Sequence, residues 1–120
     1  MLYAGIYSEI QQNSFMSDYI IAARTSELED GAKLLVEVND CLVILFRVGD
    51  QYFCIDDVCT HDGGTLSDGE HCEFEIHCPR HGARFDIRTG GALAMPATQA
   101  TKTHDVRVDK ENILVKLKSN

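Results

Sequence analysis

The stretch CTHDGGTLSDGEHCEFEIHCPRHG, residues 59–82, holds two Cys/His pairs of unequal spacing. Cys59 and His61 have one residue between them, Cys78 and His81 have two, and sixteen residues separate the pairs. Thiolates are soft metal ligands and imidazoles suit zinc, copper and iron, so these four side chains are candidate ligands of one metal centre. Zinc and an iron–sulfur centre would both accept this donor set.

The spacing of the four donors favours a centre with two metal ions. Structural zinc sites usually take their cysteines from one knuckle and their histidines from a separate pair. Here each pair contains one cysteine and one histidine. If the two cysteines hold one iron and the two histidines hold the other, each loop spans both metal ions, which accounts for the mixed pairs.

The residues around the second pair alternate between apolar and polar, which predicts a β-hairpin. Phe74, Ile76 and Cys78 share one face of an extended strand, and the residues between them share the other. Cys78 is therefore expected to point inward. Residues 78–82 are expected to form the tip of the hairpin, and residues 83–87 its returning strand.

The rest of the chain predicts an all-β domain, because short β-branched and aromatic runs alternate with residues that favour turns. We expect strands at residues 19–23, 34–38, 42–48, 52–55, 74–77, 83–87, 103–108 and 113–117. Tight turns are expected at 39–40, 49–50 and 110–112, and one short helical turn, capped by Thr25 or Ser26, within 25–32. Residues 1–17 are polar and aperiodic, so we expect a disordered N-terminal extension before a domain that covers 18–120.

Composition and charge narrow the classes of function. A chain of 120 residues fits one domain, and its net charge of −8 argues against nucleic-acid binding and favours a basic protein partner. No apolar run approaches the ~20 residues that span a membrane, and the N-terminus resembles no export signal. We therefore expect a cytoplasmic protein. Five cysteines cannot form a fully paired disulfide framework within one chain, which favours metal ligands and buried thiols.

The remaining cysteines, histidines and acidic residues are not needed for the centre. Cys41 and Cys54 lie in apolar runs and are expected to be core thiols. An exposed position is expected for Cys72, His71, His77 and His104. Seven carboxylates lie near the ligand loops and are candidates for steering a partner, although a solvated acidic surface accounts for them equally well: Asp56, Asp57, Asp62, Asp68, Glu70, Glu73 and Glu75.

The whole motif, C-x-H, sixteen residues and C-x-x-H, resembles the signature of Rieske [2Fe–2S] proteins, and most closely that of small soluble Rieske ferredoxins. The resemblance extends over roughly residues 19–118, through CTHDGGTLSDGE, CPRHGARFDIRTGGAL, MPA, HDVRVD and ILVKLK. It implies an antiparallel β-sandwich or barrel with a cluster-binding subdomain of two loops at one end, and a proline-bearing loop at 94–97 that covers the cluster. It also implies the ligands, which are Cys59 and Cys78 on the buried iron and His61 and His81 on the outer iron.

The function that this resemblance implies is electron transfer, not catalysis. The protein would carry single electrons from an NAD(P)H-dependent flavoprotein reductase to a terminal Rieske oxygenase that hydroxylates aromatic rings, and it would act as a monomer. High-potential members of the family have a disulfide and two hydroxyl donors near the cluster. This chain has Gly64, Arg80, Ala83 and Phe85 at those positions, so we expect a potential near about −150 mV, the low end for histidine-ligated clusters.

Three alternatives compete with this interpretation. A structural zinc site or a redox-sensing module could use the same four ligands. An oxygenase would need a further catalytic domain with its own iron site. The third alternative is a nitrite reductase subunit, but the small subunits of that class often lack ligands that are intact here.

Overall fold

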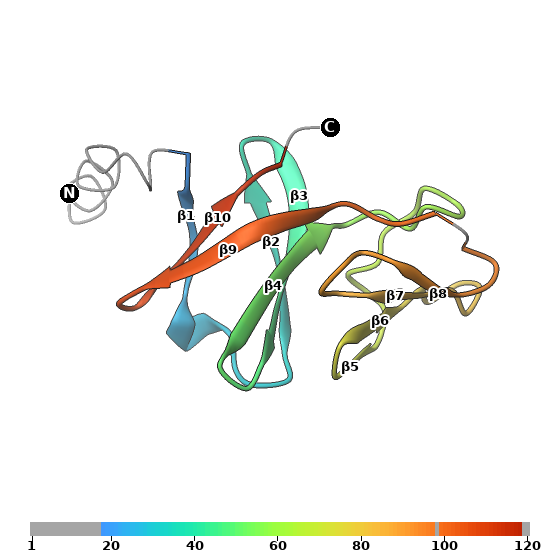
Figure 1. Ribbon diagram of the computed structural model, residues 1–120, viewed down its shortest axis with the longest axis horizontal. Coiled ribbons are helices and arrows are strands. Elements are labelled where there is room, and N and C mark those ends of the chain that lie inside the picture. Colours follow the sequence, from blue (N-terminus) through green and yellow to red (C-terminus); the bar gives the residue numbers. More distant parts are fainter. Residues whose placement is uncertain (1–17, 98, 119–120) are drawn as a thin grey trace.

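The computed structural model describes residues 18–97 and 99–118, and within these ranges every strand pairs antiparallel with its neighbours. The predicted extension 1–17 lies outside the described residues. The larger sheet has six strands in the order β1-β10-β9-β4-β3-β2. Its strands are β1 (Ile20–Arg24), β2 (Lys33–Val38), β3 (Cys41–Val48), β4 (Gln51–Asp56), β9 (Thr103–Asp109) and β10 (Asn112–Lys116). Because β1 and β2 approach each other at the two ends of this order, the sheet forms a nearly closed barrel (Figure 1).

The smaller sheet is built entirely from the segment between β4 and β9, residues 57–102, which we call the inserted unit. It has four strands in the order β5-β6-β7-β8 and lies beside the barrel (Figure 1). These strands are β5 (His71–Cys72), β6 (Glu75–His77), β7 (Arg84–Asp86) and β8 (Ala92–Ala94). At the neck of the unit, the Asp56 N–H donates to the Lys102 carbonyl at 2.9 Å, so the chain enters and leaves the unit at adjacent points.

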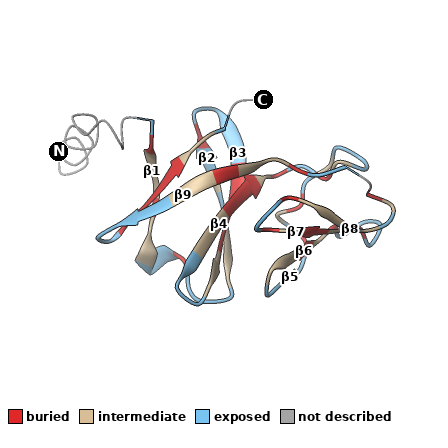
Figure 2. Cartoon of the chain, in the orientation of Figure 1, coloured by how far each residue is buried: buried red, intermediate tan, exposed pale blue. Residues whose placement is uncertain are grey.

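The strand β3 joins the two parts because it is buried on both faces. Val43 and Leu45 contribute to the barrel core, whereas Ile44 and Phe46 contribute to the core of the inserted unit. This alternation explains the uninterrupted apolar run in β3, since a strand covered on both faces needs no polar side. Figure 2 shows buried stretches in the barrel strands and in the strands of the inserted unit. The core of the inserted unit also contains Cys59, so this candidate ligand shares one core with Ile44 and Phe46 of the barrel.

The sequence predicted these strands well. All eight expected strands are present, and each end lies within one residue of the prediction. The strands β5 and β8 were missed, because segments of two and three residues are too short to show a period. The predicted helical turn is a 3-10 helix, η1 (Thr25–Glu27), but its N-cap is Arg24, whose N–H donates to the Glu27 carboxylate at 2.7 Å.

The predicted hairpin turns are confirmed, with one change of length. Asn39 and Asp40 have φ values of 49° and 66°, the conformation that a two-residue hairpin turn requires. The turn expected at 110–112 is shorter by one residue, because Asn112 pairs with Asp109 and belongs to β10. Within the described ranges, no helix is long and apolar enough to cross a membrane.

Candidate metal centre

The two cysteines of the motif meet inside the inserted unit. Cys59 follows the neck after β4, and Cys78 follows β6, and their residues are 0% and 4% exposed. The Cys78 N–H donates to the Ala83 carbonyl at 2.7 Å, which closes the predicted hairpin tip. Gly82 has φ +77° within that tip, a conformation that side chains disfavour. Cys78 therefore points inward, as the alternation of apolar and polar residues in the sequence predicted.

The two histidines of the motif meet on the outer side of the same loops. His61 and His81 are exposed, and their ring centroids lie 5.2 Å apart with an interplanar angle of 84°. Each loop therefore contributes one buried thiol and one exposed imidazole. The structure brings like donors together across the two loops, as a centre with unlike inner and outer metal ions requires.

One zinc ion and a two-iron cluster require different arrangements of the four donors. Among the described residues, the group of candidate donor atoms within 4.8 Å of one another contains both thiol sulfurs and an Asp62 carboxylate oxygen, without a histidine nitrogen. A tetrahedral zinc ion needs all four donors at about 2.0–2.3 Å from one point. Thiols on one side and imidazoles on the other fit a [2Fe–2S] cluster better, because its two irons take different ligands.

The Cys59 thiol lies in a mixed electrostatic environment. Burial raises the pKa of Cys59 above its ordinary value, whereas the backbone N–H groups of His61 and Asp62 donate to the sulfur and lower it. A metal ion binds the thiolate, so metal binding must displace the proton of the Cys59 thiol. When a metal is bound, the two N–H groups would donate to the ligand sulfur. Residue types alone did not reveal them, because the donors are backbone atoms positioned by the loop.

An ion pair that the sequence analysis missed joins the two ligand loops. Arg80 lies between Cys78 and His81, and its guanidinium donates from Nε to Asp62 Oδ2 at 2.6 Å and from Nη2 to Asp62 Oδ1 at 3.1 Å. This guanidinium holds the pKa of the Asp62 carboxyl well below its usual range. The two residues are eighteen positions apart, and their types alone did not predict the contact.

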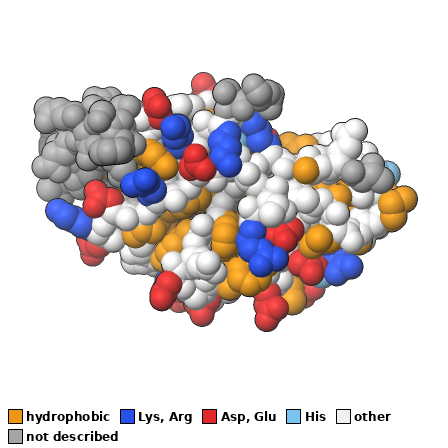
Figure 3. Space-filling view, viewed as in Figure 1, with side chains coloured by type: hydrophobic (Ala, Val, Ile, Leu, Met, Phe, Trp, Pro, Cys, Tyr) orange, Lys and Arg blue, Asp and Glu red, His pale blue; other side chains and the backbone are white. Residues whose placement is uncertain are grey.

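The predicted group of steering carboxylates is partly wrong. Asp57 is 5% exposed and accepts hydrogen bonds from the N–H groups of Leu66 and Ser67 at 2.7 and 2.8 Å. It supports the loop that follows Cys59 and is not available to a partner. Asp56 and Asp62 are also engaged, with His104 and Arg80. Figure 3 shows acidic and basic side chains intermingled on one face of the molecule, so this face has no purely acidic patch.

The surface position expected for His104 is wrong, and His71 is only partly exposed. His104 is 7% exposed, its Nε2 lies 2.6 Å from Asp56 Oδ1, and its Nδ1 accepts from the Lys118 N–H at 3.0 Å. Its position in β9, beside the neck, buries it. The ring of His71 packs edge-on against Phe46, with 4.9 Å between centroids.

Of the remaining cysteines, Cys54 is a core thiol, whereas Cys41 is not. Cys54 is 1% exposed, and burial, assisted by the charge of Asp56, raises its pKa to about 12. Cys41 is exposed because it begins β3 directly after the turn at 39–40. The exposed position expected for Cys72 is confirmed.

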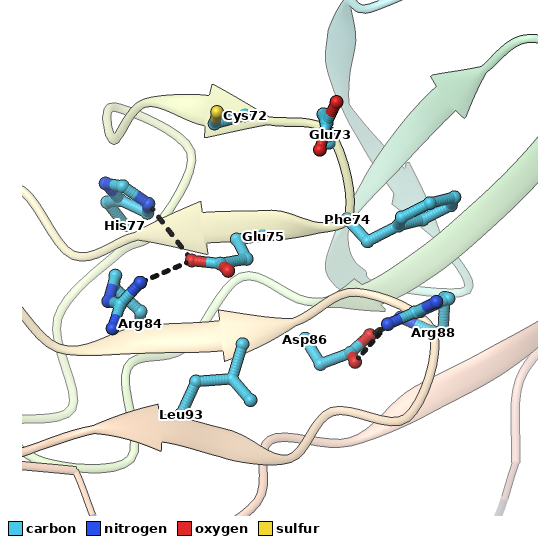
Figure 4. Close-up of a pocket in the computed structure, with 9 residues that line it drawn as sticks. All are labelled: Cys72, Glu73, Phe74, Glu75, His77, Arg84, Asp86, Arg88 and Leu93. Carbon is cyan, nitrogen blue, oxygen red and sulfur yellow. Dashed lines mark hydrogen bonds and ion pairs between the residues drawn. The ribbon is translucent and has the colours of Figure 1, made fainter.

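A hollow of about 470 Å³ lies on the outer face of the smaller sheet (Figure 4). Glu75 accepts from Arg84 Nη1 at 2.9 Å and lies 3.4 Å from His77 Nε2, and Arg88 pairs with Asp86 at 2.9 Å. These side chains alternate in sequence with the inward residues of the same strands, so the hollow opens away from the buried thiols. The guanidinium groups of Arg84 and Arg88 are each paired with a carboxylate, and we assign the hollow no ligand.

The chain is similar to known proteins over most of its length. The family model described as Rieske [2Fe-2S] domain matches residues 18–107. The ferredoxin component of the naphthalene 1,2-dioxygenase/salicylate 5-hydroxylase systems of Ralstonia sp is 34% identical over 100 residues, which cover 83% of this chain and 96% of that protein. The structure of the ferredoxin of carbazole 1,9a-dioxygenase from Nocardioides aromaticivorans IC177 matches with a TM-score of 0.80 and 33% identity, over 83% of this chain and 98% of that one. A solved complex of reduced oxygenase and oxidized ferredoxin in carbazole 1,9a-dioxygenase contains a chain that matches with a TM-score of 0.77 and 29% identity, over 82% of this chain and 93% of that one.

Proposed function

The chain belongs to the Rieske [2Fe–2S] domain family, and from this we propose that it is a ferredoxin that carries single electrons to a terminal, aromatic-ring-hydroxylating oxygenase. The observation that carries the proposal is the arrangement of the donors, with two thiols buried and two imidazoles exposed on the same pair of loops. The chain is an electron carrier in such a system and not the enzyme that transforms the substrate. Its near full-length match to ferredoxin components supports this role.

We assign the ligands by their positions in this arrangement. Cys59 and Cys78 would hold the inner iron, and His61 and His81 the outer iron. When bound, the cluster supplies a centre that accepts and releases one electron, at a potential raised by the neutral imidazole ligands. The protein excludes water from the thiol side, because both cysteines lie in the core of the inserted unit. The exposed imidazoles allow a partner to approach the outer side closely.

The residues that surround the four ligands support a potential near the low end of the range for Rieske centres. Ala83 and Phe85 are fully buried and have no hydroxyl group to donate to the cluster or its ligands. The backbone N–H groups of His61 and Asp62 donate to the Cys59 sulfur and would stabilise negative charge there. A low potential suits a carrier that is reduced from NAD(P)H through a flavoprotein reductase.

The partners follow from this role. The solved complex of an oxygenase with a related ferredoxin supports the proposal that a terminal oxygenase is the acceptor. The donor would be a flavoprotein reductase, and the face that bears His61 and His81 would serve both partners in turn. We propose a cytoplasmic monomer. The alternative of a structural zinc or redox-sensing module is not favoured, because the chain's family and its ferredoxin relatives point to an iron–sulfur cluster.

Anaerobic reconstitution with iron and sulfide tests the proposal. The wild-type protein should become coloured, and after reduction it should give an electron paramagnetic resonance signal that zinc cannot produce. The variants Cys78→Ser and His81→Cys should each lose the native spectrum, whereas Cys72→Ser, at an exposed cysteine of the same sheet, should keep it. Reduction by NADH and a flavoprotein reductase, followed by oxidation by a ring-hydroxylating oxygenase, completes the test. A colourless wild-type protein, or a native spectrum in Cys78→Ser, would overturn the assignment.

A further inference from the structure

We propose that Arg80 and Asp62 form a clamp that positions the two ligand loops against each other and balances the charge beside the cluster. The proposal deepens the function above and rests on its ligand assignment. The structure assigns both residues a positioning role, because their contacts reach the ligands through the loops.

The contacts of the clamp cross from one loop to the other. Besides the two bonds to the Asp62 carboxylate, Arg80 Nη2 donates to the Thr65 carbonyl at 2.9 Å. All three bonds run from the loop of Cys78 to the loop of Cys59. A bidentate bond between a guanidinium and a carboxylate fixes orientation as well as distance. The clamp therefore restrains how the loops, and the ligands that they bear, lie relative to each other.

Gly64 provides the space in which the guanidinium lies. A Cβ at this position would be 2.6 Å from Arg80 Nη2 and 2.7 Å from Cζ, closer than real contacts allow. The backbone there is not in the left-handed region, so space and not conformation explains the glycine. Gly64 and Arg80 fit each other across the two loops.

The Asp62 carboxylate is held in place on both sides. Oδ1 also accepts from the Gly64 N–H at 2.9 Å, and Oδ2 lies 3.5 Å from His81 Nε2. Asp62 belongs to the first loop and His81 to the second. Asp62 therefore contacts both the clamp and the imidazole that we assign to the outer iron.

The clamp also places two opposite charges beside the sulfur ligands. An Asp62 carboxylate oxygen lies within 4.8 Å of both thiol sulfurs, and Arg80 Nε lies 2.6 Å from the same carboxylate group. A positive charge near the cluster stabilises the reduced state, and a negative charge destabilises it. Since the pair is neutral as a whole, loss of either member leaves the other charge uncompensated.

Two measurements on the loaded protein separate positioning from charge. Arg80→Gln and Asp62→Asn should each speed the release of iron to a chelator by roughly two- to fivefold, the range for a partly exposed ion pair. The double variant should release iron no faster than the faster single variant, because both changes break one interaction. The midpoint potential should fall in Arg80→Gln and rise in Asp62→Asn. General loosening of the loops would shift both potentials in the same direction.

Two further variants complete the experiment. Gly64→Ala keeps both charges but displaces the guanidinium, so iron release should speed up. Arg88→Gln breaks the bidentate pair with Asp86 on the same unit and should leave release and potential unchanged. Equal release rates in wild type, Arg80→Gln and Asp62→Asn, or potentials that move together, would overturn the clamp. Failure of the wild-type protein to hold a cluster would instead overturn the function proposed above, so the two failures are distinguishable.

Discussion

Replacement of Asp57 by alanine should destabilise the inserted unit strongly. The carboxylate accepts hydrogen bonds from the Leu66 N–H at 2.7 Å, the Ser67 N–H at 2.8 Å and the Ser67 hydroxyl at 3.1 Å. A buried donor that loses its acceptor costs about 1–3 kcal/mol, and Leu66 is 0% exposed while Ser67 is half-buried. We therefore expect a loss of about 3 kcal/mol, equivalent to a fall in melting temperature of roughly 10–20 °C.

Thermal unfolding of the cluster-loaded protein, followed by circular dichroism at one fixed scan rate, checks this value. Asp57→Asn keeps a side-chain oxygen as acceptor and should show a smaller loss. Asp68→Ala removes an exposed carboxylate two residues after Leu66 and should change stability by no more than about 0.5 kcal/mol. If Asp57→Ala melts at the same temperature as Asp68→Ala, the carboxylate does not support the loop and the reasoning is refuted.

Four further predictions concern buried positions. The double variant Ala83→Ser with Phe85→Tyr should raise the midpoint potential in voltammetry, because the new hydroxyls can donate to sulfur; an unchanged potential would show that the missing hydroxyls do not set it. The Cys54 thiol, with a pKa of about 12 against 9.0 when unfolded, should resist iodoacetamide at about pH 8.5 while the exposed Cys72 reacts. Its contribution to stability is complete below pH 9.0 and should be lost as pH rises from there toward about 12, a loss absent from Cys54→Ala. His104→Leu should lower stability by about 1–3 kcal/mol in thermal melts, and an unchanged melt would show that its two hydrogen bonds are dispensable.

The features that the sequence predicted are those with a local pattern. The alternation around Cys78 has a period of two residues, which defines the strand and the inward face of the thiol. The turn at 39–40 was predicted because Asn and Asp accept positive φ. The spacing of the two Cys/His pairs suggested that like donors share a metal ion. In the structure the two thiols lie close together and so do the two imidazoles, while their role as ligands stays a prediction.

The features that the sequence missed depend on contacts between distant segments. Asp57 and His104 are polar residues that local pattern assigns to the surface, yet both lie at the neck, where the barrel and the inserted unit bury them. The contact of Arg80 with Asp62 needs both loops in their final positions. The prediction that Cys41 is a core thiol was wrong for the opposite reason. The apolar run beside it suggested burial, but Cys41 lies at the exposed start of a strand.

The neck has a consequence for protein engineering. The inserted unit, which bears all four proposed ligands, is one continuous segment of the chain. Its two ends lie side by side, because Asp56 and Lys102 are hydrogen-bonded neighbours. We expect that this segment could be exchanged between barrels without circular permutation or new linkers. The transferred segment must carry side chains that fit Ile44 and Phe46, because these barrel residues are part of the core of the inserted unit.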